Sequence, residues 1–157
     1  MNDENPVQDG TDMLRSIFEM QADLNDHVFV KNDIKAKDGS PLTMREIAEH
    51  ADAGKLGVND LPNQWLKRYA EAMAAEFDEL RDDVLWKWWS RDQIDLQNIR
   101  VELIDILHFL ISAMISSGLS AEKVFDIYQQ KHSINLTRQD KGYNQASKTE
   151  DDNRTIE

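Results

Sequence analysis

The chain contains no cysteine, and it has only six glycines and three prolines among 157 residues. Without cysteine it cannot form a disulfide, use a thiolate nucleophile or bind zinc or an iron–sulfur cluster through sulfur. Basic residues are also scarce, with 18 against 30 acidic ones, which gives a formal net charge of −12. Because nucleic-acid binding depends on dense Lys and Arg, this balance argues against a nucleic acid and against an anionic membrane surface as partners. A polyanion such as a nucleotide would have to be bound through bridging metal cations.

Long apolar runs are absent as well. The most apolar stretch, residues 106–115, is interrupted by His108 and Ser112 and is far too short to span a bilayer. The first ten residues are polar and acidic and have no feature of a signal peptide. We therefore expect a soluble, cytoplasmic protein.

Helical periodicity fills most of the chain. Apolar residues that recur every three or four positions predict long helices over 11–29, 62–84, 90–118 and 120–138. Thr43, followed three residues later by Glu46, forms a capping box that predicts a short helix between the first two. Ser90 and Gln93 form a second capping box, which predicts the start of the third long helix.

Together these elements predict an all-α fold with an antiparallel four-helix bundle core and a short extra helix. The length suits a single domain, which we expect to cover residues 1–142. Residues 143–157 are polar and acidic, and we expect them to form a disordered tail.

Four carboxylates interrupt the apolar pattern of two neighbouring helices. Glu76 and Glu79 lie beside the apolar stripe of the helix predicted over 62–84. Glu102 and Asp105 share one narrow face of the next helix, which is apolar in almost every other direction. Carboxylates on a buried helix are costly unless they are paired or bound to metal. Because the two helices should be antiparallel, both pairs can converge into a cage of oxygen ligands suited to Mg²⁺ or Mn²⁺. Taken alone, Glu76 and Glu79 could instead belong to a solvated acidic face of their helix rather than to a metal site.

Polar side chains also occupy the inward faces of the first and last helices. Gln21 and Asn25 fall within the apolar arc of the first helix. They can form an interhelical hydrogen bond, or they can present a donor and an acceptor to the edge of a pyrimidine base. Lys131, Asn135 and Arg138 continue the inward stripe of the last helix. They can stabilise the helix end, or they can bind a chain of phosphates.

Aromatic residues gather near the acidic helices. Trp86, Trp88 and Trp89 follow the first acidic helix, where they can fill the core or stack on a planar base. Phe109 lies four residues after Asp105 on the same helix face, so a second aromatic ring is expected beside the carboxylates.

The spacing of the acidic residues resembles a known signature. Glu76-x-x-Glu79, 22 intervening residues and Glu102-x-x-Asp105 are similar to the metal-binding motif of the all-α NTP pyrophosphatases, the MazG-like superfamily. Three further elements narrow the resemblance to the dimeric dUTPases of short phage and bacterial type. These elements are Gln21 with Leu24-Asn25, the block Trp86-Lys87-Trp88-Trp89, and Lys131-x-x-x-Asn135-x-x-Arg138-Gln139-Asp140-x-Gly142-Tyr143. The resemblance spans residues 14–143, although nothing over 31–59 matches a motif.

The resemblance implies hydrolysis of dUTP, and also of dUDP, to dUMP by a homodimer located in the cytoplasm, or in the host cytoplasm if the chain is phage-encoded. It implies two or three Mg²⁺ ions bound by Glu76, Glu79, Glu102 and Asp105, with Glu79 also orienting or deprotonating the attacking water. It further implies substrate contacts from two groups of residues. Gln21 and Asn25 would read the uracil edge, with Trp88 and Phe109 packing against the ring, while phosphate and sugar would be bound by Lys131, Asn135, Arg138 and Tyr143.

Two other functions stay open at this stage. The same chemistry could act on another nucleotide, such as dCTP. An acidic helical bundle could also serve only as a protein-interaction module, without catalysis.

Overall fold

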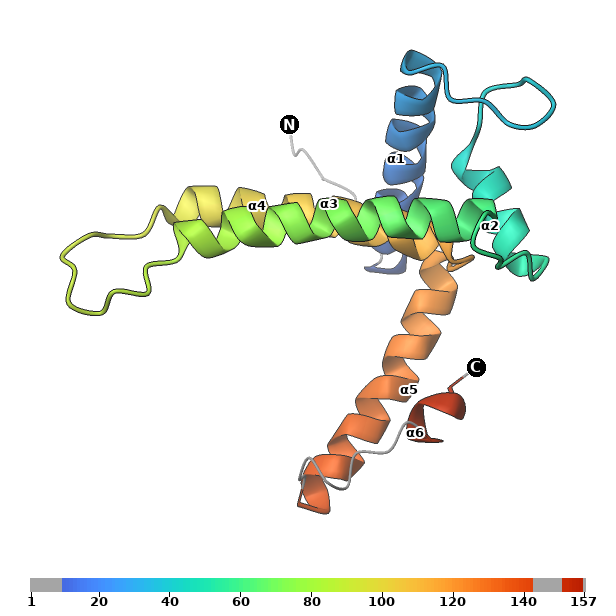
Figure 1. Ribbon diagram of the computed structural model, residues 1–157. Coiled ribbons are helices and arrows are strands. Elements are labelled where there is room, and N and C mark those ends of the chain that lie inside the picture. Colours follow the sequence, from blue (N-terminus) through green and yellow to red (C-terminus); the bar gives the residue numbers. More distant parts are fainter. Residues whose placement is uncertain (1–9, 143–150, 157) are drawn as a thin grey trace, which may run out of the picture. The chain divides into compact units, whose positions relative to one another are not determined.

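The computed structural model describes residues 10–142 and 151–156, and the side chains of 13–142 and 153–156 (Figure 1). Its helices are α1 (Gly10–Lys31), α2 (Met44–Asp52), α3 (Leu61–Asp83), α4 (Leu96–Ser116), α5 (Ala121–Asp140) and α6 (Asp151–Arg154). The predicted all-α fold is confirmed, since the described residues form no strand beyond one isolated bridge. None of the described helices is, on its own, long and apolar enough to cross a membrane, and α4 and α5 meet that test only when taken together.

The described chain divides into two compact units after Gly118. The first unit contains α1 to α4, and the second contains α5 and α6. The prediction of one domain over 1–142 stays a prediction. Most of the predicted disordered tail lies outside the described residues, and its described part contains the single turn of α6.

Helices α3 and α4 form the long antiparallel pair of the first unit and run side by side in Figure 1. The predicted start of α4 at Ser90 is wrong, because the helix begins at Leu96. The Ser90 hydroxyl accepts a hydrogen bond from the backbone N–H of Asp92, at 3.1 Å, and so forms a local turn. The carboxylate of Asp95 instead caps the helix by accepting from the N–H of Asn98, at 3.1 Å.

The short helix α2 is positioned by two polar contacts at its N-terminus. The Thr43 hydroxyl accepts from the N–H of Glu46 at 3.2 Å, as the capping box predicts. Asp26, on α1, accepts from the N–H of Met44 at 2.7 Å and so ties α1 to the start of α2. The buried apolar side chains of the first unit come from α1 to α4 and from the α1–α2 connection: Phe18, Phe29, Leu42, Met44, Ile47, Tyr69, Ile106, Ile111 and Ile115.

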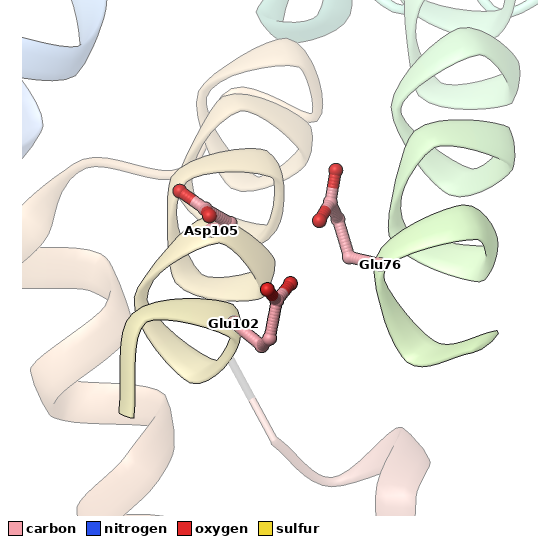
Figure 2. A group of neighbouring side chains, drawn as sticks. All are labelled: Glu76, Glu102 and Asp105. Atoms are coloured by element: carbon pink, nitrogen blue, oxygen red, sulfur yellow. The ribbon is translucent and has the colours of Figure 1, made fainter. Parts of the chain in front are cut away.

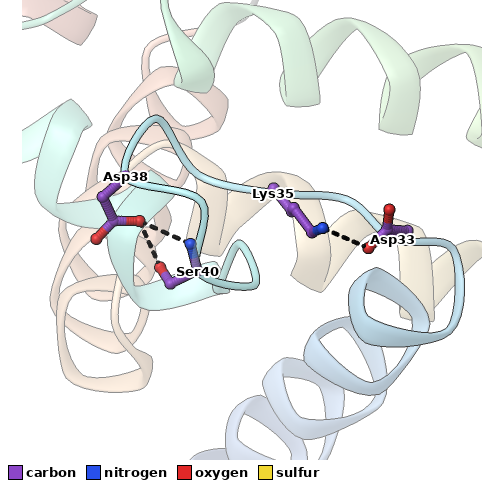
Figure 3. A network of polar contacts seen from close by, with 4 residues as sticks. All are labelled: Asp33, Lys35, Asp38 and Ser40. Atoms are coloured by element: carbon purple, nitrogen blue, oxygen red, sulfur yellow. Dashed lines mark hydrogen bonds and ion pairs between the residues drawn. The ribbon is translucent and has the colours of Figure 1, made fainter.

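The connection between α1 and α2 folds back on itself (Figure 3). Asp38 accepts hydrogen bonds from the Ser40 hydroxyl at 2.7 Å and from the Ser40 N–H at 2.9 Å, and these bonds lower the pKa of Asp38. Lys35 pairs with Asp33 at 3.0 Å, and an antiparallel bridge joins Lys35 to Pro41. The polar side chains of this connection are therefore used to hold a local turn.

Candidate active site

Three of the four predicted acidic ligands come together between α3 and α4 (Figure 2). Glu76 extends from α3, while Glu102 and Asp105 extend from α4, and one carboxylate oxygen of each lies within 4.8 Å of the others. Glu102 is only 9% exposed, and the other two are half-buried. The convergence follows from the antiparallel packing of two helices that each carry acids one turn apart.

Burial and like charge both act on the electrostatics of this cluster. Burial raises the pKa of Glu76, and the neighbouring carboxylates of Glu79, Asp105 and Glu102 raise it further. Burial also raises the pKa of Glu102, followed by repulsion from Glu79, Asp83 and Asp105. Every charged group that shifts these two pKa values is an acid, so a bound cation would relieve the repulsion.

The donor set therefore fits a hard divalent cation. Carboxylate oxygens are the ligands that Mg²⁺ and Mn²⁺ prefer in proteins, and the chain offers no sulfur ligand. The structure places Glu79 on the exposed flank of the cluster, where its charge acts on both Glu76 and Glu102. The role of all four acids as metal ligands stays a prediction.

Asn98 and Asp83 belong to this cluster, and the sequence reasoning missed both. The Asn98 side-chain amide donates to Asp83 at 2.5 Å and to Glu102 at 3.3 Å, and so bridges α3 and α4. The second bond partly offsets the rise in the pKa of Glu102. The available signal was spacing, because Asn98 precedes Glu102 by four residues and so lies one turn away on the same helix face.

A cleft of about 420 Å³ begins at the carboxylates and is lined by α1, α3 and α4. Its size is typical of a small-molecule site. The lining residues are Gln21, Leu24, Asn25, Val28, Phe29, Trp65, Tyr69, Glu76, Asp105, His108 and Phe109. The structure thus brings both predicted amides and one predicted aromatic ring into the same cleft as two of the acids.

The two amides are buried and joined across helices. Gln21 is 5% exposed and Asn25 is 8% exposed, and both donate to the hydroxyl of Ser112 on α4, at 3.0 and 2.9 Å. The interhelical hydrogen bond that the sequence left open is therefore present. Because the same amides line the cleft, the base contact also stays open as a prediction.

The aromatic predictions have different outcomes. Phe109 lines the cleft, whereas Trp88 is not among its lining residues and is 88% exposed in the connection between α3 and α4. Trp88 packs edge-to-face on Trp89, with ring centroids 5.6 Å apart. Trp65, which the sequence reasoning missed, lines the cleft and lies 4.6 Å from the ring of Phe29. Nothing in the sequence separated Trp65 from an ordinary core residue of its helix.

The predicted phosphate-binding residues lie in the second unit or outside the described residues. Lys131, Asn135 and Arg138 lie on α5, and the Lys131 ammonium donates to the side chain of Asn153. Tyr143 lies outside the described residues. Their contact with a substrate stays a prediction.

Comparison with known proteins places the chain in a family. Residues 13–120 match the family model dUTPase_2, which describes dUTPases. The chain belongs to this dUTPase family. It is also similar to the dCTP pyrophosphatase of Enterobacteria phage T4, with 35% identity over 80 residues, which is 51% of this chain and 40% of that protein.

Two further phage proteins are similar to part of the chain. The dCTP pyrophosphatase of Enterobacteria phage LZ5 is 37% identical over 79 residues, which is 50% of this chain and 40% of that protein. A DNA replication protein of phage T4 is 32% identical over 75 residues, or 46% of this chain and 16% of its own length. The matched stretch thus spans about two fifths of each pyrophosphatase. No solved structure matches the chain.

The carboxylate cluster predicts that Glu102→Gln stabilises the metal-free protein at neutral pH. Both raised pKa values mean that the folded state binds more protons than the unfolded state, so stability falls as the pH rises through the carboxylate range. Glu102→Gln removes part of this loss. In chelator, we expect a higher melting temperature at pH 7 for the variant than for the wild type, and a smaller difference at acid pH.

The matched control is Glu71→Gln on the exposed face of α3, where Glu71 pairs with Lys67 at 3.9 Å. An exposed pair of this kind contributes little, so this control should melt close to the wild type. A Glu102→Gln protein that melts at or below the wild-type temperature at pH 7 would contradict the predicted repulsion.

Proposed function

We propose that the chain is a nucleotide pyrophosphohydrolase that converts dUTP, and also dUDP, to dUMP. The observation that carries this proposal is that carboxylates and buried amides line one cleft. The amides bond to Ser112, which follows Asp105 by seven residues on α4. This spacing corresponds to about 10 Å along the helix. A base held at the amides would therefore direct its phosphates toward the acids. Family membership supports the same substrate.

Glu76, Glu79, Glu102 and Asp105 would hold the metal, which we propose to be two or three Mg²⁺ ions, with Mn²⁺ as a substitute. Bound there, divalent ions would neutralise phosphate oxygens and lower the pKa of a bound water. Glu79 is exposed at the edge of the cluster and so can orient that water and accept its proton. Lys131, Asn135, Arg138 and Tyr143 are proposed phosphate and sugar contacts on the basis of the sequence resemblance.

The base would be selected by hydrogen-bond polarity. Uracil donates from N3, whereas cytosine accepts there, so an amide in the cleft can favour one base over the other. Phe109 would pack against the ring from the cleft wall, and Trp88 is proposed as a second ring contact on the basis of the resemblance.

A second substrate is favoured by one specific observation. Two phage proteins that match the chain are named dCTP pyrophosphatases. We therefore expect Mg²⁺-dependent turnover, with dUTP hydrolysed fastest, when pyrophosphate release is assayed with dUTP, dCTP and dTTP and phosphate release is assayed with dUDP. Faster hydrolysis of dCTP than of dUTP would replace the uracil assignment with this alternative.

The Glu102→Gln variant distinguishes an enzyme from a protein that serves only as an interaction module. Loss of a ligand for the metal should lower Mg²⁺-dependent turnover by at least about 100-fold, while the protein stays folded. Glu71→Gln should keep wild-type turnover. Unchanged turnover in the Glu102→Gln protein would mean that the carboxylate cluster is not the site of hydrolysis.

Asn98 should support the metal site without being a ligand. Its amide holds Glu102 in place, and removing such a partner typically weakens metal affinity by about 10- to 100-fold. We expect Asn98→Ala to raise the Mn²⁺ dissociation constant by that factor, measured by electron paramagnetic resonance of free Mn²⁺. Gln97→Ala, one residue away on the exposed surface of α4, should bind Mn²⁺ as the wild type does. Equal affinity in both variants would exclude this supporting role.

We also propose that the protein is a homodimer. Side chains of α1 and α4, including Ile17, Met20, Ile104 and Leu107, line an apolar hollow of about 320 Å³. An exposed apolar surface of this kind is typical of a subunit interface. Light scattering should give twice the 18.2 kDa of one chain. Met20→Glu should yield a monomer, whereas Val58→Glu, in the exposed loop before α3, should not. A wild-type monomer would exclude the dimer.

A further inference from the structure

We propose that Ser112 determines which pyrimidine base the cleft accepts, because its hydroxyl fixes the orientation of the Gln21 and Asn25 amides. The inference rests on the proposed function, in which these amides contact the base. Ser112 does not itself line the cleft, so its role in specificity would be exerted through the two amides.

The Ser112 hydroxyl acts only as an acceptor toward the two amides. It is fully buried, with 0% of the residue exposed, and its hydrogen is donated to the backbone carbonyl of His108 at 2.9 Å. A hydroxyl has one hydrogen and two lone pairs. Both lone pairs of Ser112 are taken by the amide nitrogens of Gln21 at 3.0 Å and of Asn25 at 2.9 Å.

Gln21 is fixed by three partners. Its amide nitrogen donates to Ser112 and also to the side-chain oxygen of Asn25, at 3.2 Å. Its side-chain oxygen faces Nδ1 of His108, which therefore carries the proton and donates it. Exchanging the nitrogen and oxygen of Gln21 would place its oxygen against two acceptors, so both of its donors and its acceptor are committed.

Asn25 is fixed in the same way but keeps a free edge. One of its amide hydrogens goes to Ser112, and its oxygen accepts from Gln21. One N–H and one lone pair of the oxygen remain available for a ligand in the cleft. A flipped Asn25 would set its oxygen against the Ser112 oxygen, which has no hydrogen left to donate. The order of donor and acceptor on the free edge is therefore set by Ser112, which holds both Asn25 and the Gln21 amide that bonds to it.

A fixed amide edge discriminates between bases that a rotating one would accept equally. Uracil presents N3–H beside a carbonyl, and cytosine presents a bare N3 beside an amino group. For a base held in one position, a single amide orientation matches only one of these patterns, and the wrong base leaves buried polar groups unpaired. Without the Ser112 hydroxyl, the two amides lose the acceptor that they share. Asn25 and Gln21 can then flip together, with His108 in its other tautomer, and so suit either base.

The test compares Ser112→Ala with Ser116→Ala. Ser116 is also fully buried on α4, and its hydroxyl donates to the carbonyl of Ser112 at 2.8 Å without touching either amide. The two variants therefore lose the same atoms from the same helix. We expect the ratio of kcat/KM for dUTP to that for dCTP to fall at least about 10-fold, toward unity, in Ser112→Ala, and to stay within about twofold of wild type in Ser116→Ala. Equal ratios in the two variants would overturn the proposal.

A second measurement does not depend on catalysis. In the metal-free protein, NMR of the ¹⁵N-labelled side chains should show slow solvent exchange of the Gln21 amide hydrogens, and of the Asn25 hydrogen that bonds to Ser112, in the wild type and in Ser116→Ala. Exchange should be at least about 10-fold faster in Ser112→Ala. Unchanged exchange in Ser112→Ala would overturn the fixed orientation whatever the substrate.

The two measurements also separate this proposal from the proposed function. The wild-type protein could hydrolyse neither dUTP nor dCTP, while the ratio of its affinities for dUMP and dCMP still falls in Ser112→Ala. That result would overturn the proposed hydrolysis and leave the base selection in place. A wild-type protein that neither hydrolyses these nucleotides nor binds either monophosphate in calorimetry would overturn both the base selection and the function.

Discussion

Repulsion among the carboxylates between α3 and α4 is the constraint on which the site depends. Apolar packing of the two helices brings Glu76, Glu102 and Asp105 within reach of one another, and burial together with repulsion raises the pKa of Glu76 and of Glu102. A protein keeps such an arrangement at a cost in stability when a cation is to be bound there. The hydrogen bonds of Asn98 to Asp83 and Glu102 reduce this cost only partly, so the cluster remains an attractive site for a divalent ion.

The polar residues of α1 line the same cleft and are held by hydrogen bonds rather than by charge. Gln21 and Asn25 are buried, and buried amides must find partners. Ser112 and His108 supply them from α4, and the resulting network leaves only part of Asn25 available. The cleft lining therefore combines carboxylates, which suit a divalent cation, with buried amides of fixed direction. This combination agrees with membership of a dUTPase family and with similarity to phage dCTP pyrophosphatases, which differ in the base that they are named for.

The sequence predicted the acidic part of the site better than its surroundings. Helical periodicity alone placed Glu76, Glu102 and Asp105 on facing sides of two adjacent helices, since carboxylates on apolar stripes stand out. It did not separate Ser112 or Trp65 from ordinary core residues, because a serine or tryptophan on an inward helix face acquires its role only from the neighbour that it meets. The start of α4 was also misplaced, because Ser90 and Asp95 are both good capping residues and only the fold decides between them.

The sequence by itself determined the helices, their apolar faces and the acids that interrupt them, because these features repeat with the period of a single helix. Only the tertiary structure decided that Asn98 bridges two acids and that the hydroxyl of Ser112 meets both amides. It also decided which aromatic rings reach the cleft, placing Phe109 and Trp65 there. Such contacts join residues up to about ninety positions apart in the sequence, and no local pattern records which side chains will meet when the helices pack.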